Sequence, residues 1–261
     1  MKLEHVALVI VDISGYTQFL RQKDMSLLHA EEIISQLLES VIDVAEYPLI
    51  LNKLEGDAAF LYVLMGDDHA KAAKNILQQV LAFFPAFHQK AVELSHDTSF
   101  CDCDACSHIS RLKLKAFLHH GEVVVKKIRQ FEELAGENVI LIHRLLKNGV
   151  SAAEYILMTE SFSDLVEDIP NFSKERRIEN YDNTDPVSVD VFYPPSFSTP
   201  IISPSMLGKV KMMNAEMTRL FVQKTGIVKR KEFKHIPNEK ISAFNIFKGT
   251  MKMMQKKLSR G

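Results

Sequence analysis

The stretch ALVIVDISGYTQFL, residues 7–20, decides how this sequence is interpreted. Its apolar run is typical of a buried β-strand, yet the run ends at Asp12 with Ser14 and Gly15 directly behind it. A carboxylate at the tip of a buried strand, beside a glycine turn with free backbone N–H groups, suits a divalent cation that carries phosphate. An ordinary turn-forming aspartate is the alternative interpretation.

A second aspartate follows in the stretch KLEGDAAF, residues 53–60, which lies between two apolar runs. The pattern predicts a β-hairpin with Gly56 and Asp57 in its turn. If this hairpin pairs with the first strand, Asp12 and Asp57 lie at the same end of the sheet, where their oxygens suit Mg²⁺. Taken alone, Asp57 is also explained as a turn residue.

The order of predicted elements indicates the fold class. After the first strand and before the hairpin, residues 27–46 predict a helix. Asp67 and Asp68 are expected to cap a second helix that runs to about Leu94 and contains Pro85. The remaining predicted elements are two short strands, 111–119 and 121–128, joined near His120 and Gly121, a helix over 136–149, and strands within 154–162 and 187–194. This order predicts an α+β fold, a mostly antiparallel sheet with helices packed on it.

Composition places the chain among soluble globular proteins, with 46% hydrophobic and 25% charged residues. No apolar run approaches the roughly 20 residues of a membrane-spanning helix. The apolar run near the N-terminus fits a strand better than a secretory leader. Three cysteines, an odd number, argue against a disulfide scaffold, so we expect a cytoplasmic protein.

Four stretches, in this order along the chain, resemble the catalytic domain of class III nucleotide cyclases, the adenylate and guanylate cyclase family. They are VDISGYT (11–17), KLEGDAAF (53–60), HHGEVVV (119–125) and GENVILIHR (136–144). Four of the 10 glycines fall within them. The resemblance covers residues 1–195 and implies a ferredoxin-like nucleotide cyclase fold.

The resemblance also implies a site. Asp12, the Ile13 carbonyl and Asp57 match the ligands of two Mg or Mn ions. The residues that match the phosphate-binding backbone are Ser14, Gly15, Tyr16 and Thr17. Lys53 and Glu133 match the purine-reading pair, which would favour ATP over GTP, although the adjacent Glu132 leaves that register open. Arg144 matches the arginine that stabilises the transition state of cyclic AMP and pyrophosphate formation.

One position departs from the family pattern, because Ile140 stands where the family usually carries an asparagine that binds the nucleotide. Loss of one positioned donor typically costs about 10²–10³ in rate. Two interpretations follow: a weak or divergent adenylate cyclase, or a catalytically degenerate regulatory module that senses a nucleotide. Because the family forms its site between two chains and this chain carries both residue sets, the resemblance implies a homodimer.

All three cysteines lie in the stretch CDCDACSH, within an insert at about residues 98–110 that the family pattern lacks. Cys101, Cys103, Cys106 and His108 supply the four ligands of a structural zinc site. Their spacing is tighter than usual for zinc, and an iron–sulfur or redox role, or an exposed reduced loop without metal, is the alternative.

The C-terminal part of the chain differs in charge from the rest. Residues 205–261 carry 14 Lys and Arg against 3 Asp and Glu, a net +11, whereas the rest of the chain carries −12. We expect a linker at 196–205 and a basic, Met-rich helical extension at 206–261 that binds an anionic membrane surface, a protein partner or the acidic body. Nucleic acid is not expected, since no reading element is recognisable.

Overall fold

A computed structural model of the protein describes residues 1–16, 24–98, 104–182 and 184–195. The predicted linker and basic extension therefore lie outside the described residues. The strands are β1 (Lys2–Ser14), β2 (Ile50–Glu55), β3 (Ala58–Leu64), β4 (Lys113–Ile128), β5 (Phe131–Ala135), β6 (Tyr155–Thr159), β7 (Ser173–Glu179) and β8 (Val187–Tyr193). The helices are α2 (Asp24–Val44), α3 (His69–Asp97), α4 (Asp104–Ser107), α5 (Glu137–Leu145) and α6 (Glu160–Ser163), with a 3₁₀ turn η1 (Ile109–Arg111).

The strands of the described part form one sheet in the order β2-β3-β1-β4-β6-β8-β7, and β5 pairs with β4 outside this path. The β4–β6 pair is parallel and the other pairs are antiparallel. From β1 to β4 the chain follows a β-α-β-β-α-β path, the ferredoxin-like arrangement. The predicted fold class is therefore confirmed.

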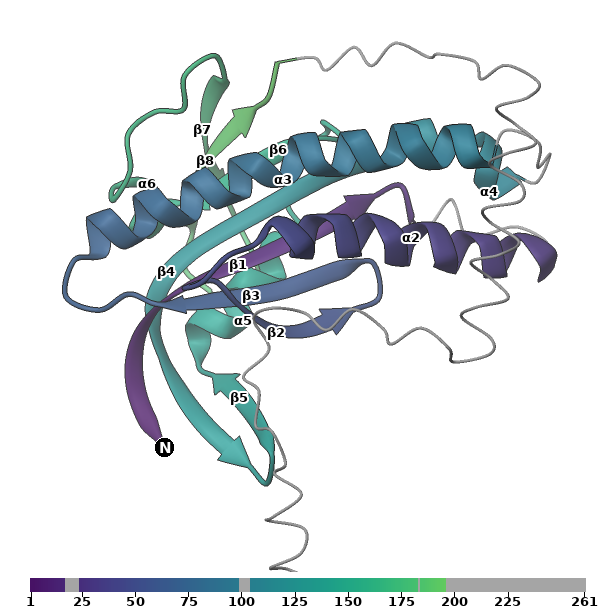
Figure 1. Cartoon of the computed structure of the whole chain (residues 1–261). Coiled ribbons are helices and arrows are strands. Elements are labelled where there is room, and N and C mark those ends of the chain that lie inside the picture. Colours follow the sequence, from purple (N-terminus) through teal and green to yellow (C-terminus); the bar gives the residue numbers. More distant parts are fainter. Residues whose placement is uncertain (17–23, 99–103, 183, 196–261) are drawn as a thin grey trace, which may run out of the picture.

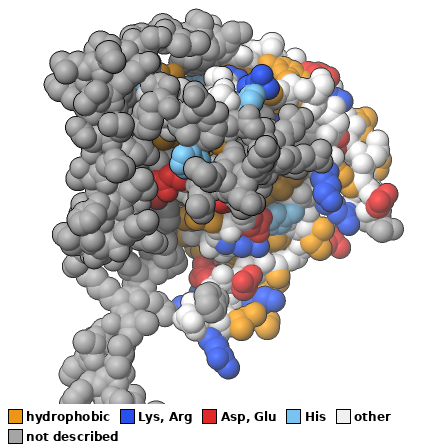
Figure 2. All heavy atoms as spheres, turned by 90° about the vertical axis from the view of Figure 1, so that its right-hand side faces the viewer, with side chains coloured by type: hydrophobic (Ala, Val, Ile, Leu, Met, Phe, Trp, Pro, Cys, Tyr) orange, Lys and Arg blue, Asp and Glu red, His pale blue; other side chains and the backbone are white. Residues whose placement is uncertain are grey.

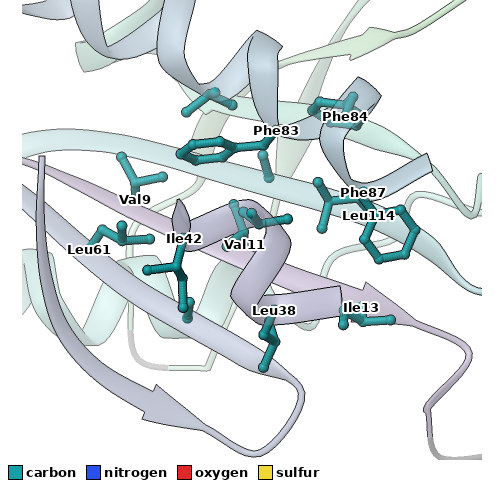
Figure 3. Packing of buried hydrophobic residues seen from close by; sticks show 14 of the residues in the cluster. Val9, Val11, Ile13, Leu38, Ile42, Leu61, Phe83, Phe84, Phe87 and Leu114 are labelled. Atoms are coloured by element: carbon teal, nitrogen blue, oxygen red, sulfur yellow. The ribbon is translucent and has the colours of Figure 1, made fainter. Parts of the chain in front are cut away.

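Helices α2 and α3 cover one face of the sheet (Figure 1). Side chains of a strand alternate between its two faces, and in β1 Val9, Val11 and Ile13 point toward these helices. Phe83 and Phe87 of α3 pack against them (Figure 3). This cluster is the larger of the two buried apolar clusters, so it is the main hydrophobic core. None of the described helices has the length and apolar composition that crossing a membrane requires.

The other face of the sheet carries a smaller apolar cluster beneath α5. The alternate residues of β1, which include Leu8 and Ile10, pack there with Ile142 and Leu145 of α5. Asp12 has the same parity and so belongs to this face. The alternation of one strand thus separates the main core from the face that carries the first predicted site residue.

Two predicted elements are corrected by the structure. The strands expected to join near His120 and Gly121 are one continuous strand, β4, which pairs with β1 from Lys2 to Ser14 without a turn. Helix α3 begins at the predicted Asp68 cap, whose carboxylate accepts from Lys71 N at 3.0 Å, but it continues past Leu94 to Asp97. Strands β5 and β7 were not expected, because their charged residues hide the alternation of a buried strand.

Candidate active site

The structure brings Asp12 and Asp57 to the same edge of the sheet. Asp12 stands near the end of β1 opposite Ala58 of β3, and Asp57 lies in the turn directly before Ala58. A hydrogen bond of 3.1 Å from Ile13 N to the Asp57 carbonyl ties the turn to the strand. The expected pairing of the hairpin with the first strand is therefore present.

Burial and neighbouring negative charges raise the pKa values of both carboxylates, and one lysine opposes the rise. Burial raises the pKa of Asp12 from 3.8 to about 6, the negative charge of Asp57 adds to the rise, and Lys115 opposes it. The pKa of Asp57 is also raised, mainly by burial, with a contribution from Glu31. Two partly buried carboxylates that repel one another form a hard oxygen donor set, which a divalent cation such as Mg²⁺ or Mn²⁺ would stabilise.

Lys115 is a site residue that sequence reasoning missed. It stands opposite Asp12 in the β1–β4 pair and lowers the pKa values of both aspartates. Its ammonium group lies 5.5 Å from the centre of the Tyr155 ring. The alternation Lys113, Leu114, Lys115 indicated a strand with charged residues on one side, but only the pairing of β1 with β4 reveals which charge they meet.

The turn after Asp12 is tied to neighbouring elements. Gly15 has a φ of +95°, a conformation that favours glycine, and directs the chain away from the strand. Ser14 Oγ donates to the Ala153 carbonyl at 2.9 Å, and Tyr16 Oη donates to Glu31 Oε1 at 2.6 Å. Thr17 lies outside the described residues. Glu31, which was also missed from the sequence, brings a third carboxylate near Asp57.

Lys53, the predicted purine-reading lysine, is held in an ion pair. Its Nζ lies 2.6 Å from Glu55 Oε1, and the other oxygen of Glu55 lies 3.4 Å from His143 Nδ1 on α5. The lysine also lies over the Phe60 ring, 5.8 Å from its centre. Phe60 belongs to the apolar cluster under α5, so Lys53 is on the same face as Asp12.

Of the two adjacent glutamates in β5, Glu132 is the one directed toward this face. Its carboxylate accepts a hydrogen bond from the Tyr62 hydroxyl, and Leu134, which shares its parity, is buried in the cluster under α5. Glu133 pairs with Lys126 and points to the opposite side of the strand. Glu132 therefore lies on the same face as Lys53, whereas the predicted Glu133 does not.

Helix α5 carries the predicted transition-state residue. Arg144 is partly exposed, and within the described ranges its guanidinium makes no hydrogen bond or ion pair, including with Asp12 and Asp57. Ile140, one turn earlier on the same side of the helix, is 54% exposed. The position that the resemblance matches to an asparagine is thus an apolar side chain at the surface.

The HHGE stretch positions α5 on the sheet instead of forming the expected turn. A Cβ at Gly121 would lie 2.5 Å from atoms of the Asn138 side chain. Asn138 Nδ2 donates to the Glu122 carbonyl at 2.8 Å, and its Oδ1 lies 2.8 Å from His119 Nε2. Gly121 therefore provides space for Asn138, which fixes the first turn of the helix against β4.

The cysteine-bearing insert is described only in part, since Cys101 and Cys103 lie outside the described residues. Cys106 is buried, and its Sγ lies 3.7 Å from His29 Nδ1. His108 Nδ1 lies 3.1 Å from Ser107 Oγ. In the described ranges no three His, Cys, Asp or Glu side chains form a ready-made metal site, so the zinc site stays a prediction. Figure 2 shows this end of the molecule, where charged and histidine side chains lie among hydrophobic ones.

Comparisons with solved structures identify the fold. The chain is similar to the adenylyl cyclase CyaB from P. aeruginosa, with a TM-score of 0.58 and 16% identity, over 75% of this chain and 96% of that one. The fold is that of a nucleotide cyclase catalytic domain. The guanylyl cyclase Cya2 has a TM-score of 0.57 and 14% identity, covering 75% of this chain and 94% of that one. The guanylate cyclase domain of RhGC from Catenaria anguillulae, solved in complex with GTP, has a TM-score of 0.52 and 15% identity. The match covers 75% of this chain and 100% of that one.

Comparisons of sequence reach only part of the cyclase-like chain. The profile of a family described as "Protein of unknown function (DUF2652)" matches residues 34–155. The "Uncharacterized protein Rv2561/Rv2562" of Mycobacterium tuberculosis (strain ATCC 25618 / H37Rv) is 39% identical over 127 residues, which are 49% of this chain and 57% of that protein. The matched segment thus spans less than two thirds of this relative. The family match includes the hairpin that carries Lys53 and Asp57.

Proposed function

We propose that the chain binds a purine nucleoside triphosphate with Mg²⁺ or Mn²⁺ and converts ATP to cyclic AMP and pyrophosphate. The observation that carries this proposal is the convergence of Asp12 and Asp57 beside Lys115, at one edge of a cyclase-like sheet. Two oxygen ligands and an ammonium group at one place match the needs of a metal-bound triphosphate.

Each residue of the candidate active site has a role in the proposed reaction. Asp12 and Asp57 would hold the metal, which, when bound, would lower the pKa of the ribose hydroxyl and neutralise phosphate charge. Lys115 would place a positive charge beside the phosphates. The backbone from Ser14 onward would donate N–H groups to them. Positioning and electrostatic stabilisation are the main means by which proteins catalyse phosphoryl transfer.

The base would be read by Lys53 and by a glutamate of β5. A lysine donates to the ring-nitrogen acceptor of adenine, and a carboxylate accepts from its amino group, so this pair favours ATP over GTP. Glu132 lies on the face of Lys53, which supports it over Glu133. The ion pair between Lys53 and Glu55 would have to open, or to be shared, when the base enters.

A head-to-tail homodimer is part of the proposal. One chain carries both the metal ligands and Arg144, and in the described residues Arg144 has no partner that would prevent it from reaching another chain. The second copy would supply Arg144, Lys53 and the glutamate to the aspartates of the first. Such a dimer would contain two equivalent sites.

The second candidate function is a nucleotide-sensing module without turnover. The exposed Ile140 favours it, because an apolar side chain cannot donate the hydrogen bond of the family asparagine. Ile140→Asn separates the two functions. If the protein is a weak cyclase, the Ile140→Asn variant should form product about 10–100-fold faster than the wild type. If the protein is a sensor, the variant should form no cyclic nucleotide.

The decisive experiment incubates the purified full chain with ATP or GTP and Mn²⁺ and measures cyclic nucleotide and nucleotide binding. Product that disappears in Asp57→Asn supports the enzyme, and binding without product supports the sensor. Asp185→Asn is the matched control, since Asp185 is exposed and lies in the loop between β7 and β8, which β4 and β6 separate from β1 in the sheet. The absence of both binding and product would contradict both functions.

A further inference from the structure

Three histidines from three elements meet at the other end of the sheet. His5 belongs to β1, His69 is the first residue of α3, and His120 belongs to β4. The ring centres are 5.5 Å apart for His5 and His69, 6.0 Å for His5 and His120, and 5.0 Å for His69 and His120. His120 belongs to the HHGEVVV stretch, but the role of that stretch in positioning α5 does not involve these three imidazoles.

The histidine cluster (His5, His69 and His120) is separate from the candidate active site. His5 and Asp12 are seven positions apart in β1, about 23 Å along an extended strand. His5 shares the parity of Val9, which faces α2 and α3, whereas Asp12 faces α5. His69 is the first residue of α3, and Figure 1 shows the end of the sheet at which β3 leads into this helix. A ligand there would not compete with one at the aspartates.

The separations of the three rings match those of imidazoles that share one metal ion. A point equidistant from three ring centres with these separations lies about 3.2 Å from each, close to the distance between a zinc ion and the centre of an imidazole that it binds. The positions of the three rings therefore already suit a common ion. Only rotation of the rings is needed to direct their nitrogens at it.

Two further observations support a ligand at this place. The Nε2 atom of His120 is buried and has no hydrogen-bond partner, although buried polar atoms nearly always have one. Glu122, two residues along the same face of β4, places Oε1 3.4 Å from His5 Nε2. A carboxylate beside a ligating imidazole is the usual outer partner in metal sites, or a fourth ligand.

The side chains do not yet converge, since the described part of the chain has no ready-made site of three ligands. The side chains of His5 and Glu122 are 53% and 49% exposed, so both can turn without disturbing the core. The N-terminus of α3 carries a partial positive charge that opposes a cation at His69. The carboxylates of Asp68, the helix cap, and Glu122 offset this charge.

We propose that His5, His69 and His120, with Glu122, form a binding site for a late first-row divalent ion such as Zn²⁺, Ni²⁺ or Co²⁺. Imidazole nitrogens with one carboxylate are ligands that these ions prefer over Mg²⁺. The bound ion joins β1, β4 and the start of α3, three segments that are far apart in the sequence. It therefore stabilises the end of the sheet opposite the candidate active site.

The test titrates the full-length chain with Co²⁺ and follows the visible absorption of the bound ion and the melting temperature. We expect cobalt d–d absorption without a thiolate charge-transfer band, which separates this site from the cysteine insert. His5→Ala and His69→Ala should each weaken this binding by at least about 100-fold and remove the rise in melting temperature. Asp57→Asn, which affects the other cation site, should leave the signal unchanged.

His96→Ala is the matched control, because His96 lies in the last turn of α3, far along the helix from His69. It should bind Co²⁺ like the wild type. Circular dichroism shows whether each variant is folded. Wild-type protein that binds no Co²⁺ through nitrogen ligands would overturn the proposal. So would folded His5→Ala and His69→Ala variants that bind it as tightly as the wild type, or a loss of binding in His96→Ala equal to theirs.

Discussion

The two faces of the central sheet differ in what they bury. The face under α2 and α3 holds the larger of the two apolar cores, part of which is shown in Figure 3. The face under α5 holds a smaller cluster, and at the strand ends it carries the charged residues Asp12, Lys53 and Lys115. The comparison assigns stability mainly to the first face and the proposed chemistry to the second.

The lengths of the covering helices explain this difference. Helices α2 and α3 have 21 and 29 residues and extend along the sheet, whereas α5 has 9. A helix advances about 1.5 Å per residue, so α5 spans only about 14 Å and leaves the strand ends uncovered. Charged side chains can remain hydrated there, which they could not do beneath α2 and α3.

The largest effect is expected in the core under α2 and α3. Phe83→Ala removes a fully buried aromatic side chain of α3 and should lower the free energy of unfolding by about 3–5 kcal/mol. Chemical denaturation measures the change. Ile178→Ala is the control, since Ile178 is 65% exposed and should change stability by less than about 0.5 kcal/mol. Equal losses in the two variants would contradict the assignment of stability to this face.

On the face under α5, removing a carboxylate should stabilise the fold. The pKa of Asp12 is raised from 3.8 unfolded to about 6 folded, so the folded state binds more protons between these pH values. The contribution of Asp12 to the free energy of unfolding is therefore highest below about pH 4 and falls as the pH rises through about 6. Asp12→Asn removes this loss and should raise the free energy of unfolding at pH 7 by about 2–3 kcal/mol.

Urea denaturation at several pH values between 4 and 7 measures the Asp12 effect. Addition of Mn²⁺ should raise the melting temperature of the wild type and leave that of Asp12→Asn unchanged. If the stabilities of the wild type and the variant had the same dependence on pH, Asp12 would not be the cause of the loss of stability at higher pH.

A substitution at the junction of the sheet and α5 should have an intermediate effect. Gly121→Ala places a Cβ 2.5 Å from the Asn138 side chain and should cost about 1–3 kcal/mol of stability. The double variant Gly121→Ala/Asn138→Ala removes the clash but also the hydrogen bonds of Asn138 to His119 and Glu122. A thermodynamic cycle over the two substitutions should show coupling. Additive effects would mean that the glycine serves another purpose.

The smallest effect concerns the balance of charges at the site. Lys115→Met removes the cation that opposes the rise in the Asp12 pKa, so that pKa should increase by about one unit from its value of about 6. Titration of the labelled carboxyl group by NMR measures it. Lys113→Met is the control, since Lys113 is the first residue of the same strand. An unchanged Asp12 pKa in Lys115→Met would place the lysine outside the site.

Local sequence patterns allowed the positions of the two aspartates to be predicted. The apolar run of β1 and the Gly56-Asp57 turn were recognisable, and antiparallel pairing then placed Asp12 and Asp57 at one edge. The Asp68 cap was predicted correctly for the same reason, because capping depends on neighbouring residues. Lys115 and Glu31 were missed because they approach the aspartates only through the packing of β4 and α2, which no local pattern of the sequence indicates.

The sequence by itself determined the alternation of its strands and the positions of its turns, since both depend on backbone preferences and on the side chains of adjacent residues. Only the tertiary structure decided that β4 runs straight through Gly121, because pairing with the whole of β1 outweighs a local turn signal. It also decided that Glu132, and not Glu133, lies on the same face of the sheet as Lys53, since the side chains that pack beneath β5 fix which side of that strand turns inward.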